Sequence, residues 1–311
     1  MIWFLFVCLI LILLAFDLGV INKKAKVLRA REAGLFTMLW VSLAMMFGVV
    51  VYHLYSSDLV ENPLDLEPLE AALLYLTGYL VELSLSMDNI FVISMIFSYF
   101  AIPRKYQHRV LFWGILGAIF FRALMIFLGV ALIEKFDWMI YVFGVILLYS
   151  AYKMAMGGDD EVDFNNKPIV KLVRRVLPVT KEFEGEKFIV KKKWLWAVTP
   201  LFIVLIVIEL TDVIFAIDSI PAILGITTDP FIVFSSNIFA ILGLRSMYFL
   251  LDSLLARFVY LKFSLIFILS FVAVKMLLIE VIHLPVWISL SVILIALVAG
   301  TLGSLMKTQS H

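Results

Sequence analysis

Long apolar runs separated by short polar segments form the pattern of this 311-residue chain. A helix needs about 20 apolar residues to cross the ~30 Å hydrocarbon core of a bilayer. Measured against that length, the sequence predicts an all-α polytopic membrane protein with about nine transmembrane helices. Their expected positions are 2–21, 34–55, 69–100, 108–132, 137–156, 194–226, 231–252, 262–282 and 285–306.

Composition supports a membrane protein and excludes some chemistry. Hydrophobic residues make up 64% of the chain, against about 45–50% in soluble domains. Basic and acidic residues nearly balance, at 25 and 24, so net charge says nothing about partners. We expect no nucleic-acid partner, and a homo-oligomer stays open. The one cysteine, Cys8, cannot form an intramolecular disulfide or a CxxC redox pair. The first apolar run has no basic leader and no cleavage motif, so we expect a membrane span there rather than a signal peptide.

Basic residues gather in alternate connecting segments and orient the spans. The 22–33 segment and the long polar 157–193 insert are basic, so both should be cytoplasmic. The 56–68 segment carries four acidic residues and no Lys or Arg, so it should lie outside. This alternation predicts an N-terminus outside the cell and a C-terminus in the cytoplasm.

Two acidic sequences recur inside apolar runs. The first is Glu82-Leu-Ser-Leu-Ser-Met-Asp88-Asn89-Ile90 and the second is Asp212-Val-Ile-Phe-Ala-Ile-Asp218-Ser219-Ile220. Further along, Arg122 matches Arg245 and Lys153 matches Lys275 at nearly the same spacing. Matching helices of the two units are three spans apart, an odd number, so we expect two inverted three-helix repeats, a recurring design in secondary transporters.

The predicted organisation follows from these repeats. It comprises two N-terminal helices with an outer loop (1–68), the first repeat (69–156), a cytoplasmic polar loop (157–193), the second repeat (194–282), and a final helix with a cytoplasmic tail (283–311).

The helices that carry the acidic sequences are expected to be discontinuous. A continuous helix over 69–100 would be about 48 Å long, well beyond the bilayer core. Residues nine apart on a straight helix point in opposite directions, so Glu209 and Asp218 could not converge on one site. Pro221 also removes a backbone donor. We therefore expect unwound backbone near 86–89 and 217–221, meeting at mid-membrane.

Buried carboxylates in lipid need a compensating partner, and a bound cation is one. Carboxylate, amide and hydroxyl oxygens suit Mg²⁺, Ca²⁺ or Mn²⁺ better than Cu(I) or structural zinc. The candidate metal ligands are Glu82, Asp88, Asn89, Glu209, Asp212 and Asp218. Four further residues could bind metal or support its ligands: Ser219, Asn237, Met87 and Asp17.

Each candidate also has a structural interpretation. The acids could cap helices, pair with arginines or join buried hydrogen-bond networks, and Met87 could simply pack. Asn89, Ser219 and Asn237 could instead link helices by hydrogen bonds. Arg122 and Arg245 are expected to supply counter-charge, pairing with a carboxylate when the site is empty, or to be purely structural.

At these residues the chain resembles the TerC family of integral membrane proteins, closest to its Alx subgroup. The resemblance covers nearly the whole chain and includes Glu82–Phe91, Glu209–Ile223, Thr228-Asp-Pro-Phe-Ile-Val and Ser236-Asn237-Ile-Phe-Ala-Ile-Leu-Gly-Leu-Arg245. It implies a transporter in the bacterial inner membrane that exports Mn²⁺ from the cytoplasm. The family's acidic residues fall on Glu82, Asp88, Glu209, Asp212 and Asp218, with Asn89 beside them. The first repeat departs from the second by having Gly114 where the second has Asn237.

Three functions remain in competition. The first is a secondary transporter that carries Mn²⁺ as its substrate by alternating access; protons should compete with the metal, because clustered carboxylates raise one another's pKa. The second is an intramembrane aspartyl protease, although neither Asp88 nor Asp218 lies in a G-x-G-D-like context. The third is a membrane redox modulator, for which the sequence offers no evident electron carrier. We expect no enzymatic activity and no redox cofactor.

Overall fold

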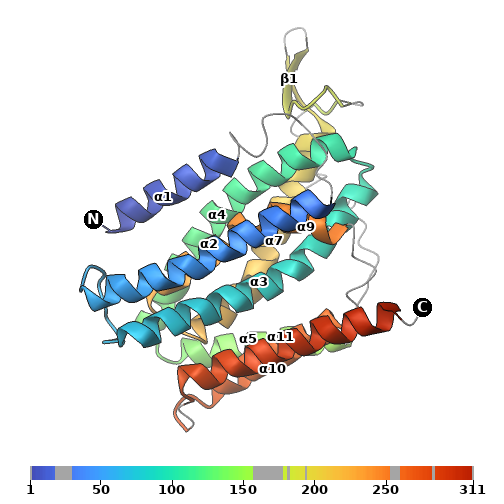
Figure 1. Cartoon of the computed structure of the whole chain (residues 1–311). Coiled ribbons are helices and arrows are strands. Elements are labelled where there is room, and N and C mark those ends of the chain that lie inside the picture. The colour runs from blue at the N-terminus through green and yellow to red at the C-terminus, as the bar shows by residue number, and fades with distance from the viewer. Residues whose placement is uncertain are drawn as a thin grey trace.

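The computed structural model describes residues 2–17, 30–156, 178–180, 183–192, 195–252, 260–281 and 284–309. Helices dominate this part of the chain (Figure 1). They are α1 (Ile2–Phe16), α2 (Ala30–Ser56), α3 (Pro68–Tyr99), α4 (Arg104–Lys135), α5 (Met139–Ala155), α7 (Pro200–Leu224), α8 (Pro230–Leu242), α9 (Leu244–Asp252), α10 (Leu261–Leu277) and α11 (Val286–Gln309). The strands β1 (Ile189–Lys192) and β2 (Leu195–Val198) form an antiparallel hairpin.

The helices make this an integral, multi-pass membrane protein. Within the described residues, α2, α3, α4, α7 and α11 are long and apolar enough to cross a bilayer, and the pair α8 and α9 would be a sixth span. The predicted spans at 2–21, 137–156 and 262–282 coincide with α1, α5 and α10, of 15, 17 and 17 residues. These helices are shorter than the ~20 residues of a typical span, so nine crossings stay a prediction.

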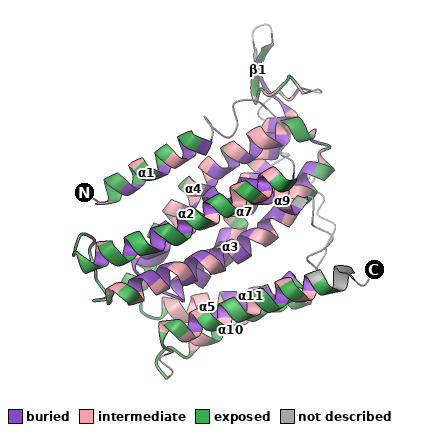
Figure 2. Cartoon of the chain, viewed as in Figure 1, coloured by how far each residue is buried: buried purple, intermediate pink, exposed green. Residues whose placement is uncertain are grey.

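Helix α3 lies in the middle of the bundle and is mostly buried (Figure 2). It packs against α2, α7, α8 and α11, while α4 packs against α7 and α5 against α10. Helix α1 lies on one side of the bundle, and α5, α10 and α11 lie together on the other (Figure 1). Phe6 of α1 contacts the rings of Phe47 and Phe231, which joins this helix to α2 and α8.

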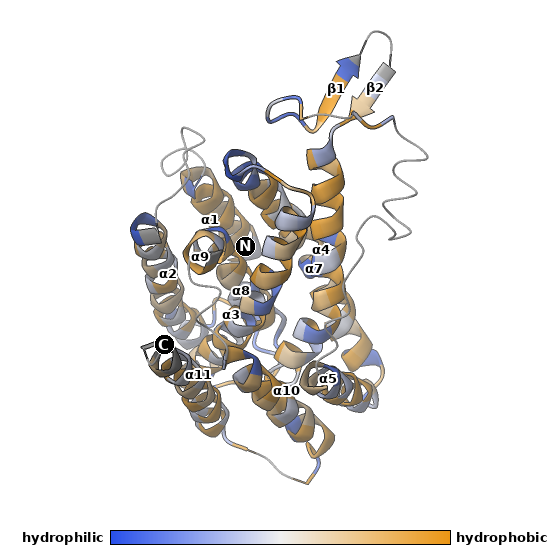
Figure 3. Ribbon diagram, turned by 90° about the vertical axis from the view of Figure 1, so that its right-hand side faces the viewer, coloured by the Kyte–Doolittle hydropathy of each residue, from blue (hydrophilic) through white to orange (hydrophobic). Residues whose placement is uncertain are grey.

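The ends of several predicted spans differ in the structure. The span expected at 194–226 begins instead with β2, and α7 starts at Pro200. Figure 3 shows the hairpin standing away from the largely hydrophobic helices. The basic 22–29 stretch and most of the 157–193 insert lie outside the described residues.

The expected unwound stretches are wrong. Helix α3 continues through 86–89 and α7 continues through Pro221. The hydroxyls of Ser84 and Thr77 donate to carbonyls one turn earlier in their own helix, at Leu80 (2.5 Å) and Leu73 (2.6 Å), so these side chains do not compensate broken backbone. Pro221 lies in the last turn of α7, where its missing N–H removes one hydrogen bond near the helix end.

The break lies elsewhere, between α8 and α9. These two helices meet at Gly243 with a bend of 42°. Glycine is a poor helix former, and the Ser246 hydroxyl donates to the Gly243 carbonyl (2.9 Å). At the other end of α8, Asp229 is fully buried and caps the helix, its Oδ1 accepting from the N–H groups of Phe231 and Ile232 (both 3.0 Å). Burial raises the pKa of the Asp229 carboxyl above its usual range.

Candidate cation site around Arg122

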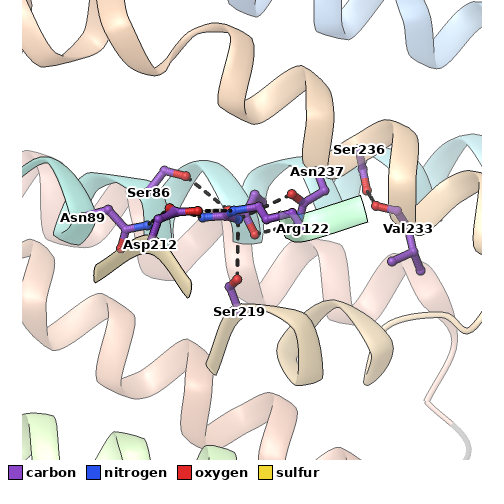
Figure 4. A network of polar contacts seen from close by, with 9 residues as sticks. Ser86, Asn89, Arg122, Asp212, Ser219, Val233, Ser236 and Asn237 are labelled. Atoms are coloured by element: carbon purple, nitrogen blue, oxygen red, sulfur yellow. Dashed lines mark hydrogen bonds and ion pairs between the residues drawn. The ribbon is translucent and has the colours of Figure 1, made fainter. Parts of the chain in front are cut away.

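A fully buried arginine, Arg122 of α4, is the centre of the polar network inside the bundle (Figure 4). Its Nε and Nη2 donate to the two oxygens of Asp212 on α7, at 3.2 and 3.0 Å. Its Nη1 donates to Glu82 Oε1 on α3 and, at longer range, to Ser219 Oγ (3.5 Å) and Asn237 Oδ1 (3.4 Å). One guanidinium therefore joins four helices: α3, α4, α7 and α8.

Glu82 and Asp212 use their remaining acceptor positions on neutral polar groups. Glu82 is fully buried; its Oε2 accepts from Asn237 Nδ2 (3.0 Å) and its Oε1 from Ser86 Oγ (3.3 Å). Asp212 Oδ1 accepts from Asn89 Nδ2 (3.5 Å). When the oxygen and nitrogen of the Asn89 side-chain amide are exchanged, the amide nitrogen donates to the Leu85 carbonyl and the amide oxygen accepts from Arg122 Nη2, both at 3.3 Å. This second orientation satisfies both ends of the amide.

The charges of this cluster do not cancel. Two carboxylates share one guanidinium, so the cluster carries a formal charge of −1 if both acids are ionised. Removing one member of a buried ion pair is far more costly than the pair itself is stabilising. Arg122 therefore satisfies the acids in this conformation, and its loss would leave two acids facing each other.

Asp218 and Asp88 lie away from Arg122. Asp218 Oδ1 accepts from Ser150 Oγ on α5 (2.5 Å). Asp88, nearly two turns beyond Glu82 on α3, is half-buried and interacts electrostatically with Lys262 on α10. The two aspartates thus face the third helices of the two expected repeats. Ser150 was not among the candidates; its only sequence signal is its position one turn before Lys153 on an otherwise apolar helix.

Glu209 lies one turn before Asp212 on α7 and faces α4. A Cβ added to Gly117 of α4 would overlap its carboxylate, so the acid fills the space that this glycine leaves. Its Oε2 is buried and has no hydrogen-bond partner in the described part of the chain. Such an unpaired acceptor is unusual and calls for an explanation.

The last three candidates belong to other contacts. Asp17, at the end of α1, pairs with Arg245 of α9, with 2.6 Å between Oδ2 and Nη2. Met87 is half-buried and packs against the apolar cluster that includes Ile90 and Val207. Arg245 therefore does not join the site as Arg122 does, because it follows the bend at Gly243.

The structure thus brings together only part of the predicted site. Glu82, Asp212, Asn89, Ser219 and Asn237 meet around Arg122, whereas Asp88, Asp218, Glu209, Met87 and Asp17 lie at other contacts. Across the described residues, no three His, Cys, Asp or Glu side chains come close enough to hold a metal ion. Glu82 and Asp212, which belong to different predicted repeats, share Arg122 as their partner.

Comparison with known proteins places the chain in a family. Residues 68–311 match the integral membrane protein TerC family. The chain is 45% identical to an uncharacterized membrane protein of Myxococcus xanthus, over 99% of this chain and 92% of the relative. It is 43% identical to an uncharacterized membrane protein of Rickettsia bellii, over 98% and 97%. It is 44% identical to Alx of Escherichia coli K12, described as a candidate membrane-bound redox modulator, over 94% and 90%. No solved structure matches the chain. With a family match over most of its length, the chain belongs to the TerC family of integral membrane proteins.

Proposed function

We propose that the protein exports a divalent metal ion, Mn²⁺ in the first place, across the cytoplasmic membrane by alternating access. The observation that carries the proposal is the meeting of Glu82 and Asp212 around Arg122. Two acids from distant segments share the interior of an apolar helix bundle with amide and hydroxyl oxygens. Intramembrane acids of this kind commonly mark an ion pathway, and their oxygens suit a hard divalent cation.

The packing of the helices supports two inverted repeats around this point. Helix α3 packs against α8, α4 against α7, and α5 against α10. In repeat terms, the first helix of each unit contacts the second helix of the other, and the third contacts the third. A twofold relation between two three-helix units produces this reciprocal arrangement, and transporter sites commonly lie at such an interface.

The proposed direction of transport follows from the charge pattern. Basic segments in the cytoplasm put the N-terminus outside and the C-terminus inside. In this orientation Asp88 lies on the cytoplasmic side of Glu82, and Asp218 lies on the outer side of Asp212. Each aspartate would then bind the ion on its way to or from the central acids. Inward proton movement, through competition for the same carboxylates, would drive export.

Metal accumulation in cells tests the proposal. Cells that lack their own Mn²⁺ exporters should accumulate less Mn²⁺ when they produce the wild-type protein. The variants Glu82→Gln, Asp212→Asn, Asp88→Asn and Asp218→Asn should each lose most of this protection. Asp65→Asn, in the loop between α2 and α3, is the matched control and should export normally. Full export by the Glu82 and Asp212 variants at wild-type protein levels would overturn the site.

A redox function is the second candidate, and the description of the Alx relatives favours it. It would need an electron carrier bound to this chain, since the sequence has one cysteine and four histidines. An absorbance spectrum of the purified protein separates the two candidates. Haem or flavin bands that respond to reductant would support the redox function over transport.

A further inference from the structure

Arg122 occupies the position that a transported cation would need. Its guanidinium bonds to Glu82 and Asp212 and reaches the oxygens of Ser219 and Asn237. A divalent ion bound to the same oxygens would be strongly repelled by a guanidinium held against them. The ion can therefore bind these two acids only if Arg122 withdraws from them.

A withdrawn arginine needs another acid, since a buried unpaired guanidinium is costly. Glu209 meets the requirement: its Oε2 is buried and has no hydrogen-bond partner in the described part of the protein. It precedes Asp212 by three residues, so it lies about one turn, or ~5 Å, along α7 from the present partner of Arg122.

The direction of movement is also set by the helices. Gly114 faces Ile208, Gly117 faces Glu209 and Gly129 faces Leu224, so α4 and α7 run parallel to each other. Side chains on a helix lean toward its N-terminus, which on α4 is the direction from Arg122 to Gly117. The missing side chain at Gly117 leaves the space that the Glu209 carboxylate fills.

We propose that Arg122 competes with the transported cation for Glu82 and Asp212. When the cation binds these two acids, the Arg122 guanidinium moves to Glu209. The proposal rests on the proposed function, because it assigns roles at that same site. It makes Glu209 a positioning residue that accepts Arg122, not a ligand of the metal. Arg122 also takes the place of the ion in the empty site and offsets one of the two acid charges, so that the acids need no ion when the transporter returns.

Equilibrium Mn²⁺ binding to the purified full-length protein, followed by the electron paramagnetic resonance signal of free Mn²⁺, tests these roles. Arg122→Gln removes the competitor and should bind Mn²⁺ at least tenfold more tightly than wild type. Glu209→Gln removes the alternative acceptor and should bind at least tenfold more weakly. The double variant should bind as Arg122→Gln does, within about twofold, because Glu209 has no role once Arg122 is absent; contacting residues reveal such coupling in double-mutant cycles.

The outcomes separate the two proposals. If the double variant is weaker than Arg122→Gln by the same factor as Glu209→Gln is weaker than wild type, Glu209 is a metal ligand and the exchange is wrong. Unchanged or weaker binding by Arg122→Gln would also overturn it, while leaving transport standing. Absence of Mn²⁺ binding by both wild type and Arg122→Gln would overturn the proposed function together with the exchange.

Two further variants guard against misfolding. Arg245→Gln removes the other buried arginine, at the matching repeat position, and should leave Mn²⁺ affinity unchanged. If Arg122→Gln does not fold, R122Q/D212N serves as the background. This double variant lacks the arginine but keeps the formal charge of −1 that the wild-type cluster carries. Adding Glu209→Gln to that background should not change Mn²⁺ affinity, and a further loss would contradict the exchange.

Discussion

Gly117 of α4 and Glu209 of α7 lie so close together that the Glu209 carboxylate occupies the space that a Cβ at position 117 would need. Gly117→Ala should therefore displace Glu209. The displaced group is the end of a flexible side chain, so the protein should still fold; alanine is also favoured over glycine in a helix by up to about 1 kcal/mol. We expect Mn²⁺ affinity to fall several-fold, as measured by paramagnetic resonance.

Gly114→Ala is the control for this substitution. It lies on the same helix, and its added Cβ would meet only Ile208 Cγ2, at an ordinary 3.6 Å. The midpoint temperature of thermal unfolding should be equal to or slightly above the wild-type value for both variants. An alanine at 117 that leaves Mn²⁺ affinity unchanged would show that the position of Glu209 does not matter for binding.

The hydrogen bond from Ser150 to Asp218 gives a prediction for the role of Asp218 in the proposed transport. Ser150→Ala removes the donor and leaves the Asp218 carboxylate less well satisfied, a change of about 1–3 kcal/mol for a buried group. We expect Mn²⁺ export to fall about tenfold, against near-complete loss for Asp218→Asn. The measurement is Mn²⁺ efflux from loaded cells.

Ser291→Ala is its matched control, because Ser291 is exposed on α11 and donates to the Trp287 carbonyl of its own helix (2.8 Å). Export at the wild-type rate by the alanine variant of Ser150 would show that this hydrogen bond does not position Asp218 for transport.

The ion pair between Asp17 and Arg245 should anchor α1 to the bundle. Both side chains are buried, so Asp17→Asn or Arg245→Gln should each destabilise the protein by about 3–5 kcal/mol. The double variant Asp17→Asn with Arg245→Gln should lose less than the sum of the single losses. Chemical unfolding of the four proteins in detergent measures this coupling, and additive losses would contradict it.

The helix positions could be predicted from sequence because a membrane span requires an apolar run of known length, which is a local property. The members of the polar cluster could also be identified, since buried acids and amides are conspicuous among apolar residues. Their pairing could not, because it depends on the rotation and tilt of each helix. Arg122 and Arg245 look equivalent in sequence, yet one binds Asp212 and the other Asp17.

The position of the helix break was predicted wrongly for a physical reason. Pro221 and the serines near Asp88 suggested broken helices, but α7 and α3 continue through them. Ser84 donates to the Leu80 carbonyl of its own helix and Ser86 donates to the Glu82 carboxylate. The bend occurs at Gly243, which aligns with Phe120 in the first of the two predicted repeats. A single glycine in an apolar helix is a weak signal, because neighbouring helices decide whether the chain bends there.

The cap of α8 predicts a difference between two substitutions at one position. Asp229→Ala removes the acceptor for the N–H groups of Phe231 and Ile232 and should destabilise the protein by about 1–2 kcal/mol. Asp229→Asn keeps an acceptor oxygen and should lose much less. Thermal unfolding in detergent distinguishes them, and equal losses would mean that the charge of Asp229, not its capping bond, stabilises this end of α8.

Whether the short helices α5 and α10 cross the bilayer decides between nine crossings and fewer. The test introduces exposed cysteines at Glu61, Lys105, Lys187 and Glu280 one at a time in a Cys8→Ser background. With nine crossings, a membrane-impermeant maleimide on intact cells should label the cysteines at 61 and 280. Those at 105 and 187 should react only after the membrane is permeabilised.

Each short helix has its own reporter in this experiment. Helix α4 is expected to end outside, so position 187 lies inside only if α5 crosses the membrane. Helix α9 is expected to end inside, so position 280 lies outside only if α10 crosses. Labelling at 187 in intact cells would show that α5 does not cross the membrane. Protection at 280 would show that α10 does not cross it. Loss of the α5 crossing would break the inverted relation between the predicted repeats, because α3 and α7 run in opposite directions only if an even number of crossings, here α4 and α5, lies between them. Loss of the α10 crossing would leave the second predicted repeat without its third span.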